Sequence, residues 1–269
     1  MLRLPVIAIA TGLAVILATV IFSTKDPGLF INLPGLSIIV GGVLTALFFS
    51  YSKSDILTAF RTVKLLIDNH AIDKQQAIKD MTAIAYLWNR KDLKGVEKKL
   101  STIDNSFLHM GVQHIIDGRT TDEIASVLNW KIRQLHHSEY RSAKLFHSLA
   151  MFAPAFGMVG TLLGLVNMMY LISDQPSIDI ASHLAIALVT TFYGLIFANV
   201  FFKPIAIKLE RRADQLVEWM RIMMVGIMMV EKRKSAAFIE LAMETLDPFE
   251  HCNLGAELTS RPLEPALNH

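Results

Sequence analysis

Four long apolar runs, separated by polar segments, form the main hydropathy pattern of the chain. The longest uncharged run, Leu145 to Ser173, contains no Asp, Glu, Lys or Arg and exceeds the roughly 20 residues that an α-helix needs to cross a bilayer. Three further uncharged runs are also long enough to span it: Pro5 to Phe22, Pro27 to Ser52 and Ile180 to Phe202. The pattern predicts an all-α polytopic membrane protein with four transmembrane helices.

The first two runs predict a transmembrane hairpin over residues 1–52. No small-x-small cleavage signature follows Pro5 to Phe22, so we expect a permanent span and not a signal peptide. A short turn, Lys25 to Gly28, leads to the second span. Its helix is expected to begin near Leu33 and to end near Tyr51.

Residues 53–142 change to an amphipathic pattern and predict a cytoplasmic helical domain. The segment carries 9 Lys and 5 Arg between Lys53 and Arg141, whereas the two short outer loops carry only Lys25. Because positively charged loops stay on the cytoplasmic side, this segment and both chain termini are expected in the cytoplasm. We expect helices in the domain at Ser54–Asn69, Asp73–Arg90 and Lys91–Ile103.

A long helix is predicted to lead from this domain into the third span. Thr120 and Glu123 have the spacing of a capping box, and no proline follows before Pro154. Spans three and four, residues 143–204, are therefore expected to extend into the cytoplasm. Residues 205–269 are expected to form a C-terminal cytoplasmic helix and tail, in which a stripe of methionines is typical of a packing surface.

Composition narrows the function classes. With 269 residues, 52% of them hydrophobic, and a mean hydropathy of +0.42, the chain is too apolar for an ordinary soluble protein. A net charge of +2 does not indicate a nucleic-acid binder. The single cysteine, Cys252, excludes an intrachain disulfide and a cysteine-based metal cluster. No zinc-protease, phosphate-loop or nucleophile-elbow motif occurs, so we expect no catalytic residue, cofactor or bound metal.

The third span combines small residues, a threonine and a proline. Gly157, Gly160 and Gly164 lie three and four residues apart, so they admit another helix at close range. Thr161 lies on the same side of this helix as Pro154, which frees a backbone carbonyl that must find a donor, water or an ion. The alternative is ordinary transmembrane packing, with the Thr161 hydroxyl bonded back to its own helix.

The polar groups of the four spans include no internal Asp or Glu. A proton or sodium pathway usually needs an ionisable group within the membrane. The polar groups that the third and fourth spans do supply include the hydroxyls of Thr161, Thr190 and Thr191 and the amides of Asn167 and Asn199. Neutral oxygens can line a cation path but cannot neutralise a cation. If ions pass, the negative charge must come from a partner subunit.

Four segments carry a resemblance to a known family. They are the second-span segment from Phe30 to Gly42, the Asn105-Ser-Phe-Leu segment, Ala153 to Thr161 in the third span, and Thr190-Thr-Phe-Tyr-Gly194 in the fourth. With these motifs the sequence resembles the A subunit of the bacterial flagellar stator, the MotA/PomA family. The arrangement of two spans, a cytoplasmic block and two more spans also resembles that family, and not its three-span ExbB/TolQ relatives.

The resemblance implies a function in the bacterial inner membrane. Five A subunits are expected to surround two B subunits (MotB/PomB-like), whose membrane helices carry the ion-binding aspartate. Ion flow would turn the A ring and apply torque to the rotor protein FliG. Pro154 and Pro204 match prolines linked to conformational coupling. Thr161 matches a position that is threonine in sodium-driven members, and Thr191 matches a more widely shared threonine, so sodium is expected and the proton is the alternative.

The resemblance also implies a rotor-facing group of charges. Family members have a basic residue followed eight positions later by an acidic one. Arg90 and Lys91 match the first, but the match of the second to Glu97 needs a one-residue gap. We therefore expect a contact distributed over Arg90, Lys91, Lys94, Glu97 and Lys98, with a solvated helix face as the alternative.

Two other functions remain open from the sequence. One is a proton-driven energiser similar to ExbB/TolQ that powers a non-flagellar process. The other is a structural membrane scaffold that conducts nothing, for which replacing Thr161 or Pro154 with alanine would leave function intact.

Overall fold

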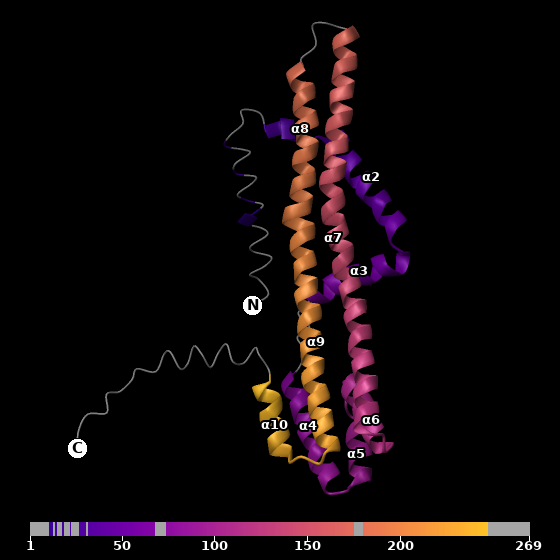
Figure 1. Cartoon of the computed structure of the whole chain (residues 1–269). Coiled ribbons are helices and arrows are strands. Elements are labelled where there is room, and N and C mark those ends of the chain that lie inside the picture. The colour runs from indigo at the N-terminus through magenta and orange to yellow at the C-terminus, as the bar shows by residue number, and fades with distance from the viewer. Residues whose placement is uncertain are drawn as a thin grey trace, which may run out of the picture. The chain divides into compact units, whose positions relative to one another are not determined.

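The computed structural model describes residues 27–30, 32–67, 74–174 and 180–246, together with residues 11, 12, 14, 18 and 22. This part of the chain is helical and contains no strand, as the sequence predicts. In chain order the elements are η1 (Pro27–Phe30), α2 (Leu33–Ser50), α3 (Lys53–Ile67), α4 (Lys74–Asn89), α5 (Leu93–Leu100), α6 (Ser106–Ile116), α7 (Thr121–Asp174), α8 (Ile180–Ile196), the π-helix η2 (Phe197–Phe202), α9 (Lys203–Glu231) and α10 (Ala236–Thr245) (Figure 1).

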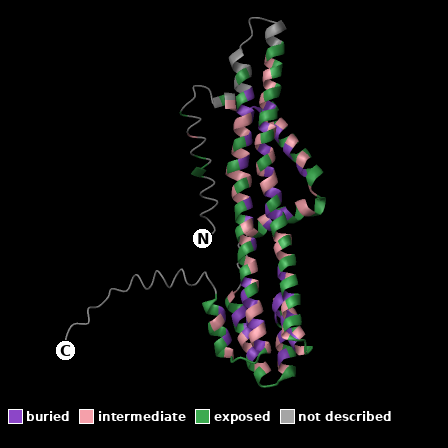
Figure 2. Cartoon of the chain, in the orientation of Figure 1, coloured by how far each residue is buried: buried purple, intermediate pink, exposed green. Residues whose placement is uncertain are grey.

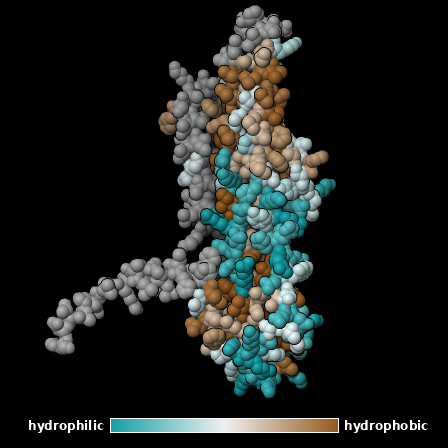
Figure 3. Space-filling view, viewed as in Figure 1, coloured by the Kyte–Doolittle hydropathy of each residue, from teal (hydrophilic) through white to brown (hydrophobic). Residues whose placement is uncertain are grey.

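Three helices of the described part are long and apolar enough to cross a membrane. They are Leu33–Ser50, Thr121–Tyr170 and Ala187–Glu231, which overlap the predicted second, third and fourth spans. The predicted first span, Pro5 to Phe22, lies outside the described residues apart from a few isolated positions. Figure 3 shows apolar surface where α7 and α8 run together, as a lipid-facing surface requires.

The chain divides into two compact units. The first contains residues 1–70 and 137–213, and the second contains residues 71–136 and 214–269. Both α7 and α9 contribute residues to each unit. Each unit has its own cluster of buried apolar side chains.

In the first unit, α2 packs by one narrow stripe. Ile39, Val43 and Leu47 lie four residues apart and are buried, whereas Phe48 and Phe49 on the other side are exposed. Phe146, Leu149 and Ala153 of α7, which lie three and four residues apart, belong to the same buried cluster. Figure 2 shows the buried positions in purple along these helices. Each helix therefore presents one face to its neighbours and leaves the remainder apolar and exposed.

Helix starts are set by short polar side chains. Asn32 caps α2, because its Oδ1 accepts a hydrogen bond from the Gly35 N–H at 3.0 Å. The capping box before α7 is confirmed, since the Thr120 N–H donates to Glu123 Oε2 at 3.0 Å and the Glu123 N–H donates to Thr120 Oγ1 at 3.4 Å. From this cap α7 continues without a break to Asp174, with Pro154 inside it.

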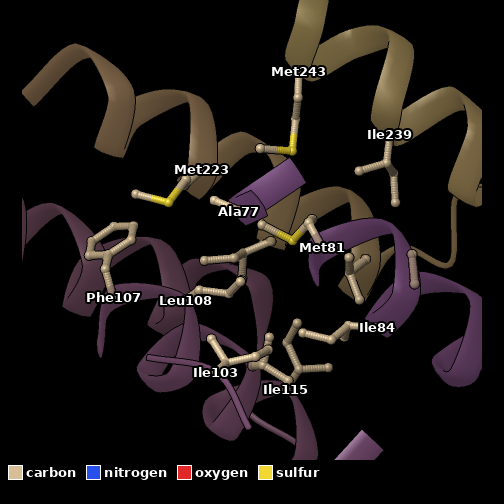
Figure 4. Packing of buried hydrophobic residues seen from close by; sticks show 14 of the residues in the cluster. Ala77, Met81, Ile84, Ile103, Phe107, Leu108, Ile115, Met223, Ile239 and Met243 are labelled. Atoms are coloured by element: carbon tan, nitrogen blue, oxygen red, sulfur yellow. The ribbon is translucent and has the colours of Figure 1, made fainter. Parts of the chain in front are cut away.

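The second unit has a methionine-rich core. Met81, Met223 and Met243 are buried and pack with Leu108 and Ile239 from different helices (Figure 4). Unbranched thioether side chains fill irregular gaps in a core. The predicted role of the methionine stripe as a packing surface is confirmed at Met223.

The helix predicted for Lys91–Ile103 is present but shorter, so its predicted bounds are wrong: α5 runs from Leu93 to Leu100. Lys91 has a positive φ of 60°, and Asp92 caps a shorter helix by accepting from the Gly95 N–H at 3.0 Å. An additional helix, α6, follows in residues for which no helix was predicted. Asn105 is its cap and accepts from the N–H groups of Phe107 and Leu108 at 3.1 Å each.

The predicted fourth span ends in a π-helix. The six residues of η2 join α8 to α9, and the Lys203 N–H bonds to the Ala198 carbonyl, five residues back. Pro204 follows directly as the second residue of α9. A proline ring clashes with the carbonyl four residues before it, and the wider turn relieves this clash without breaking the helix.

Candidate ion site between α7 and α8

Glycines bring the backbones of α7 and α8 close together. A Cβ atom built on Gly160 would lie 2.9 Å from the Thr190 Cβ, and one on Gly164 would lie 2.8 Å from the Ala187 Cβ. From the other side, a Cβ on Gly194 would lie 2.6 Å from the Ala153 carbonyl oxygen. These distances are shorter than real Cβ contacts, so the two helices can approach this closely only because the side chains are absent.

The carbonyl of Gly157 on α7 is accessible to side chains of α8. A Cβ there would lie 3.2 Å from both the Thr190 carbonyl oxygen and the Thr191 Cα. Three threonine hydroxyls point at the Gly157 carbonyl oxygen, with Oγ1 distances of 3.1 Å from Thr161, 3.3 Å from Thr190 and 3.2 Å from Thr191. The structure therefore brings together the three predicted ion-path residues around one backbone oxygen.

The hydrogen bonds at this oxygen compete with one another. Within α7 the Gly157 carbonyl already accepts the helical N–H four residues ahead, and a carbonyl has only two lone pairs. The Thr190 hydroxyl also reaches the Ala187 carbonyl at 2.6 Å, and the Thr161 and Thr191 hydroxyls bond to each other. The site thus holds more hydroxyl donors than the Gly157 oxygen can accept.

The lone pairs of these oxygens, and not the surplus of O–H donors, suit a hard cation. Hydroxyl and carbonyl oxygens are the ligands that small hard cations take, and intramembrane carbonyls at helix irregularities coordinate sodium in transporters. Thr190 is buried, and Thr161 and Thr191 are half-buried. All four oxygens are neutral, so they can orient a cation but not balance its charge. The two amides predicted beside them do not join them: Asn167 is exposed, and Asn199 Nδ2 donates to the Leu195 carbonyl at 3.0 Å.

Helix α2 reaches the same site from a third direction. A Cβ on Gly35 would lie 2.5 Å from the Thr190 Cγ2, and one on Gly42 would lie 2.2 Å from the Phe156 ring. Asn32, the cap of α2, is buried, and its Nδ2 finds no acceptor among the described residues. This contribution was not predicted, although Asn32 two residues before Pro34 is a recognisable helix-start signal.

The two predicted coupling prolines lie at different distances from the site. Pro154 precedes Gly157 by three residues in α7, and its Cα would be 3.2 Å from a Cβ on Gly194. It therefore belongs to the helix contact that carries the hydroxyls. Pro204 lies further along the chain, directly after the π-helix.

The predicted rotor-facing charges lie in the second unit, separate from the oxygens. Arg90 donates to the Tyr86 hydroxyl at 2.8 Å and covers its ring at 5.2 Å. The other four, Lys91, Lys94, Glu97 and Lys98, are exposed. All five belong to the turn between α4 and α5 or to α5 itself.

A second basic turn lies against this one and was missed by the sequence analysis. Asn89 Nδ2 donates to the Lys234 carbonyl at 2.9 Å, and Arg233 lies over the Trp88 ring at 5.4 Å. The exposed residues Lys232, Arg233 and Lys234 therefore extend the positive surface. The Lys-Arg-Lys run is visible in the sequence, but its position beside the other turn is a tertiary contact.

No metal cluster competes with this assignment in the described part of the chain. Among those residues, no group of three or more His, Cys, Asp and Glu side chains could hold a metal ion. The candidate site is therefore the set of neutral oxygens between α7 and α8.

Comparison with known proteins identifies the family. Residues 99–222 match the MotA/TolQ/ExbB proton channel family. Motility protein A of Cereibacter sphaeroides is 30% identical over 214 residues, which cover 78% of this chain and 82% of the relative. Motility protein A of Treponema pallidum is 28% identical, covering 82% and 84%, and the chemotaxis protein PomA of Vibrio alginolyticus is 27% identical, covering 79% and 83%.

Solved structures share the fold. The chain superposes on the structure of C. jejuni MotAB with a TM-score of 0.81 at 18% identity, covering 98% of each chain. It superposes on the flagellar MotAB stator complex from Bacillus subtilis with a TM-score of 0.80 at 21% identity, covering 94% of this chain and 98% of the other. The solved structures show the shared fold, and the sequence relatives show that the chain belongs to the MotA/PomA family of flagellar stator A subunits.

Proposed function

We propose that this protein is the A subunit of a flagellar stator that couples sodium flow to torque. The observation that carries the proposal is the convergence of the Thr161, Thr190 and Thr191 hydroxyls on the Gly157 carbonyl. Four neutral oxygens in an apolar helix pair offer ligands to a dehydrated cation. The fold and the sequence relatives support the stator role.

The missing negative charge defines the partner. Because the spans contain no internal carboxylate, a cation beside Thr161 needs a counter-charge from outside this chain. A B subunit of the MotB/PomB type, with an aspartate on its membrane helix, would supply it. In the assembly of five A and two B subunits implied by the resemblance, rotation of the A ring would bring successive A subunits next to the same aspartate.

The cytoplasmic unit would transmit the motion. The cations around Arg90 and Lys94 are exposed and suit the acidic surface of a rotor protein such as FliG. In this proposal the chain lies in the bacterial inner membrane, with the second unit and both termini in the cytoplasm, and the excess of Lys and Arg in residues 53–142 supports this orientation.

The experiment that tests the coupling ion measures motor rotation against external sodium at constant proton-motive force. Cells that lack their own stators would express this chain with its B partner, as wild type, Thr161→Ala or Thr45→Ala. Thr45 is the matched control, because among the described residues its hydroxyl bonds only its own helix, at the Gly41 carbonyl 2.8 Å away. We expect speed to rise with sodium in the wild type and in Thr45→Ala, and this dependence to weaken in Thr161→Ala.

Two other results would change the assignment. If rotation ignores sodium in all three proteins, the coupling ion is the proton, as the name of the matched channel family suggests, and Thr161 serves packing. If both subunits assemble and the motor does not turn, a non-flagellar energiser replaces the stator proposal.

A further inference from the structure

We propose that Tyr193 is a positioning residue that holds the Thr190 and Thr191 hydroxyls at the Gly157 carbonyl by tying α8 to the start of α2. This inference rests on the proposed cation path. It adds a residue that bonds none of the site oxygens and would act through the orientation of α8.

The Tyr193 hydroxyl makes two backbone hydrogen bonds. It donates to the Phe30 carbonyl and accepts from the Asn32 N–H at 3.0 Å. Both groups precede the first turn of α2, where backbone groups have no helical partner. One phenol therefore satisfies two backbone groups of a segment more than 160 positions away in the sequence.

Aromatic packing fixes the place at which these bonds form. The Phe30 ring meets the Phe192 ring edge to face, with centroids 5.7 Å apart. Tyr193 itself is half-buried against the core of the first unit. Without the Tyr193 hydroxyl, the Asn32 N–H and the Phe30 carbonyl would lose their hydrogen-bond partner. Water could not readily replace it, because the surroundings are apolar.

The tie lies within one helical turn of the site. Tyr193 follows Thr190 by three residues, so the two side chains are neighbours on the surface of α8. The Thr190 methyl group meets α2 at Gly35, where an added Cβ would lie 2.5 Å from Cγ2, while the Thr190 hydroxyl faces Gly157 on α7. Rotation of α8 about its axis would thus break the Tyr193 hydrogen bonds and, in the same movement, displace Thr190 and Thr191 from the Gly157 carbonyl.

The first test is Tyr193→Phe, which keeps the ring and removes the hydroxyl. Rotation speed would be titrated against external sodium in cells expressing the full chain and its B partner. We expect the sodium concentration for half-maximal speed to rise about fivefold, the change expected for the loss of one ordinary hydrogen bond. Speed at saturating sodium should stay close to that of the wild type, because all three threonine hydroxyls remain.

The matched control is Tyr170→Phe, a change of the same kind at an exposed position of α7, where the half-saturating concentration should not move. A second pair tests the link from the α2 side. Gly35→Ala pushes against the Thr190 methyl group, whereas Gly41→Ala meets no atom within 4 Å. We expect Gly35→Ala to raise the half-saturating sodium concentration and Gly41→Ala to leave it unchanged, which keeps the test decisive if Tyr193→Phe fails to assemble.

An equal loss of speed at every sodium concentration in Tyr193→Phe, or no loss at all, would overturn the positioning role. Failure of the sodium proposal can be distinguished from failure of the Tyr193 positioning role, because the wild type itself would then show no sodium dependence. In that case the same variants are titrated against external pH, and an unchanged half-saturation point in Tyr193→Phe and Gly35→Ala overturns the inference.

Discussion

Thr161 on α7 and Thr191 on α8 are hydrogen-bonded to each other, and each hydroxyl also lies within hydrogen-bonding distance of the Gly157 carbonyl oxygen, at 3.1 and 3.2 Å. Neither contact alone distinguishes an ion path from packing, since threonines in membrane helices often bond a carbonyl one turn back. The hydrogen bond between Thr161 and Thr191 does make the contact of α7 with α8 depend on these two hydroxyls, so changes to the hydroxyl can test the proposed ion path against packing.

The hydroxyl, and not the bulk, of Thr161 should therefore determine sodium dependence. Thr161→Ser keeps the oxygen and Thr161→Val keeps the volume. We expect rotation of Thr161→Ser motors to retain sodium dependence and that of Thr161→Val motors to lose it, measured as speed against external sodium. Similar sodium dependence in both variants would mean that the side chain only packs.

Gly194 should tolerate no side chain. A Cβ there would meet the Ala153 carbonyl oxygen at 2.6 Å, and a backbone atom cannot rotate away. We expect Gly194→Ala to destabilise the helix pair by about 1–3 kcal/mol, the usual cost of overpacking, as measured by thermal unfolding of the purified complex. Gly41→Ala is the control, and equal melting temperatures for the two variants would contradict the close contact.

Pro154 should matter more for function than for stability. A proline inside a helix removes a hydrogen bond at a cost of about 3 kcal/mol, so Pro154→Ala should leave the complex at least as stable as the wild type. We expect the rotation speed to fall, because α7 of the variant regains the backbone hydrogen bond that Pro154 removes and therefore resists bending beside Gly157. Normal rotation with unchanged thermal stability would exclude a coupling role for this residue.

The basic surface should affect torque without affecting assembly. We expect the double variant Arg90→Glu with Lys94→Glu to assemble in the membrane at wild-type levels and to reduce rotation strongly, because reversed charges repel an acidic partner. The control is Arg133→Glu, an exposed cation on α7 outside this surface. Equal defects in both proteins would indicate a general effect of lost positive charge.

The start of α7 should loosen in acid. The Thr120 backbone N–H, followed by the Thr120 hydroxyl, lowers the pKa of Glu123 from its ordinary value. A lowered pKa means that the bond stabilises the helix start above the ordinary carboxyl pKa and that this contribution is lost as pH falls through the lowered value. Hydrogen exchange of this turn, corrected for intrinsic rates, should therefore accelerate in acid, and Glu123→Gln should remove the pH dependence.

Much of the helix pattern could be predicted because its signals are local. Asn32 and Pro34 mark the start of α2, and the Thr120 capping box marks the start of α7. Asn105 carries an equally local signal, but a capping asparagine and a turn asparagine look alike in sequence, so α6 was missed. The identity of the ion-path threonines came from spacing and resemblance.

The arrangement of the candidate site could not be predicted in the same way. Which hydroxyls meet the Gly157 carbonyl depends on the rotation of α8 relative to α7, and periodicity fixes the faces of a helix only within about 100° per residue. The bond from Tyr193 to the start of α2 and the contact of Asn89 with Lys234 join segments far apart in the chain. They depend on tertiary packing.

The π-helix at Phe197–Phe202 changes the angular register of the polypeptide after it. Because the N–H of Lys203 reaches back five residues instead of four, every later side chain is turned by about 100° from the direction that continuous α-helical winding would give. Among these side chains is Glu210, whose Oε1 lies 3.0 Å from His147 Nε2 on α7. Conversion of this π-turn to an α-turn would rotate the following helix about its axis. Glu210 would then face another side of the helix and lose its contact with His147, while nearly every backbone hydrogen bond remained in place.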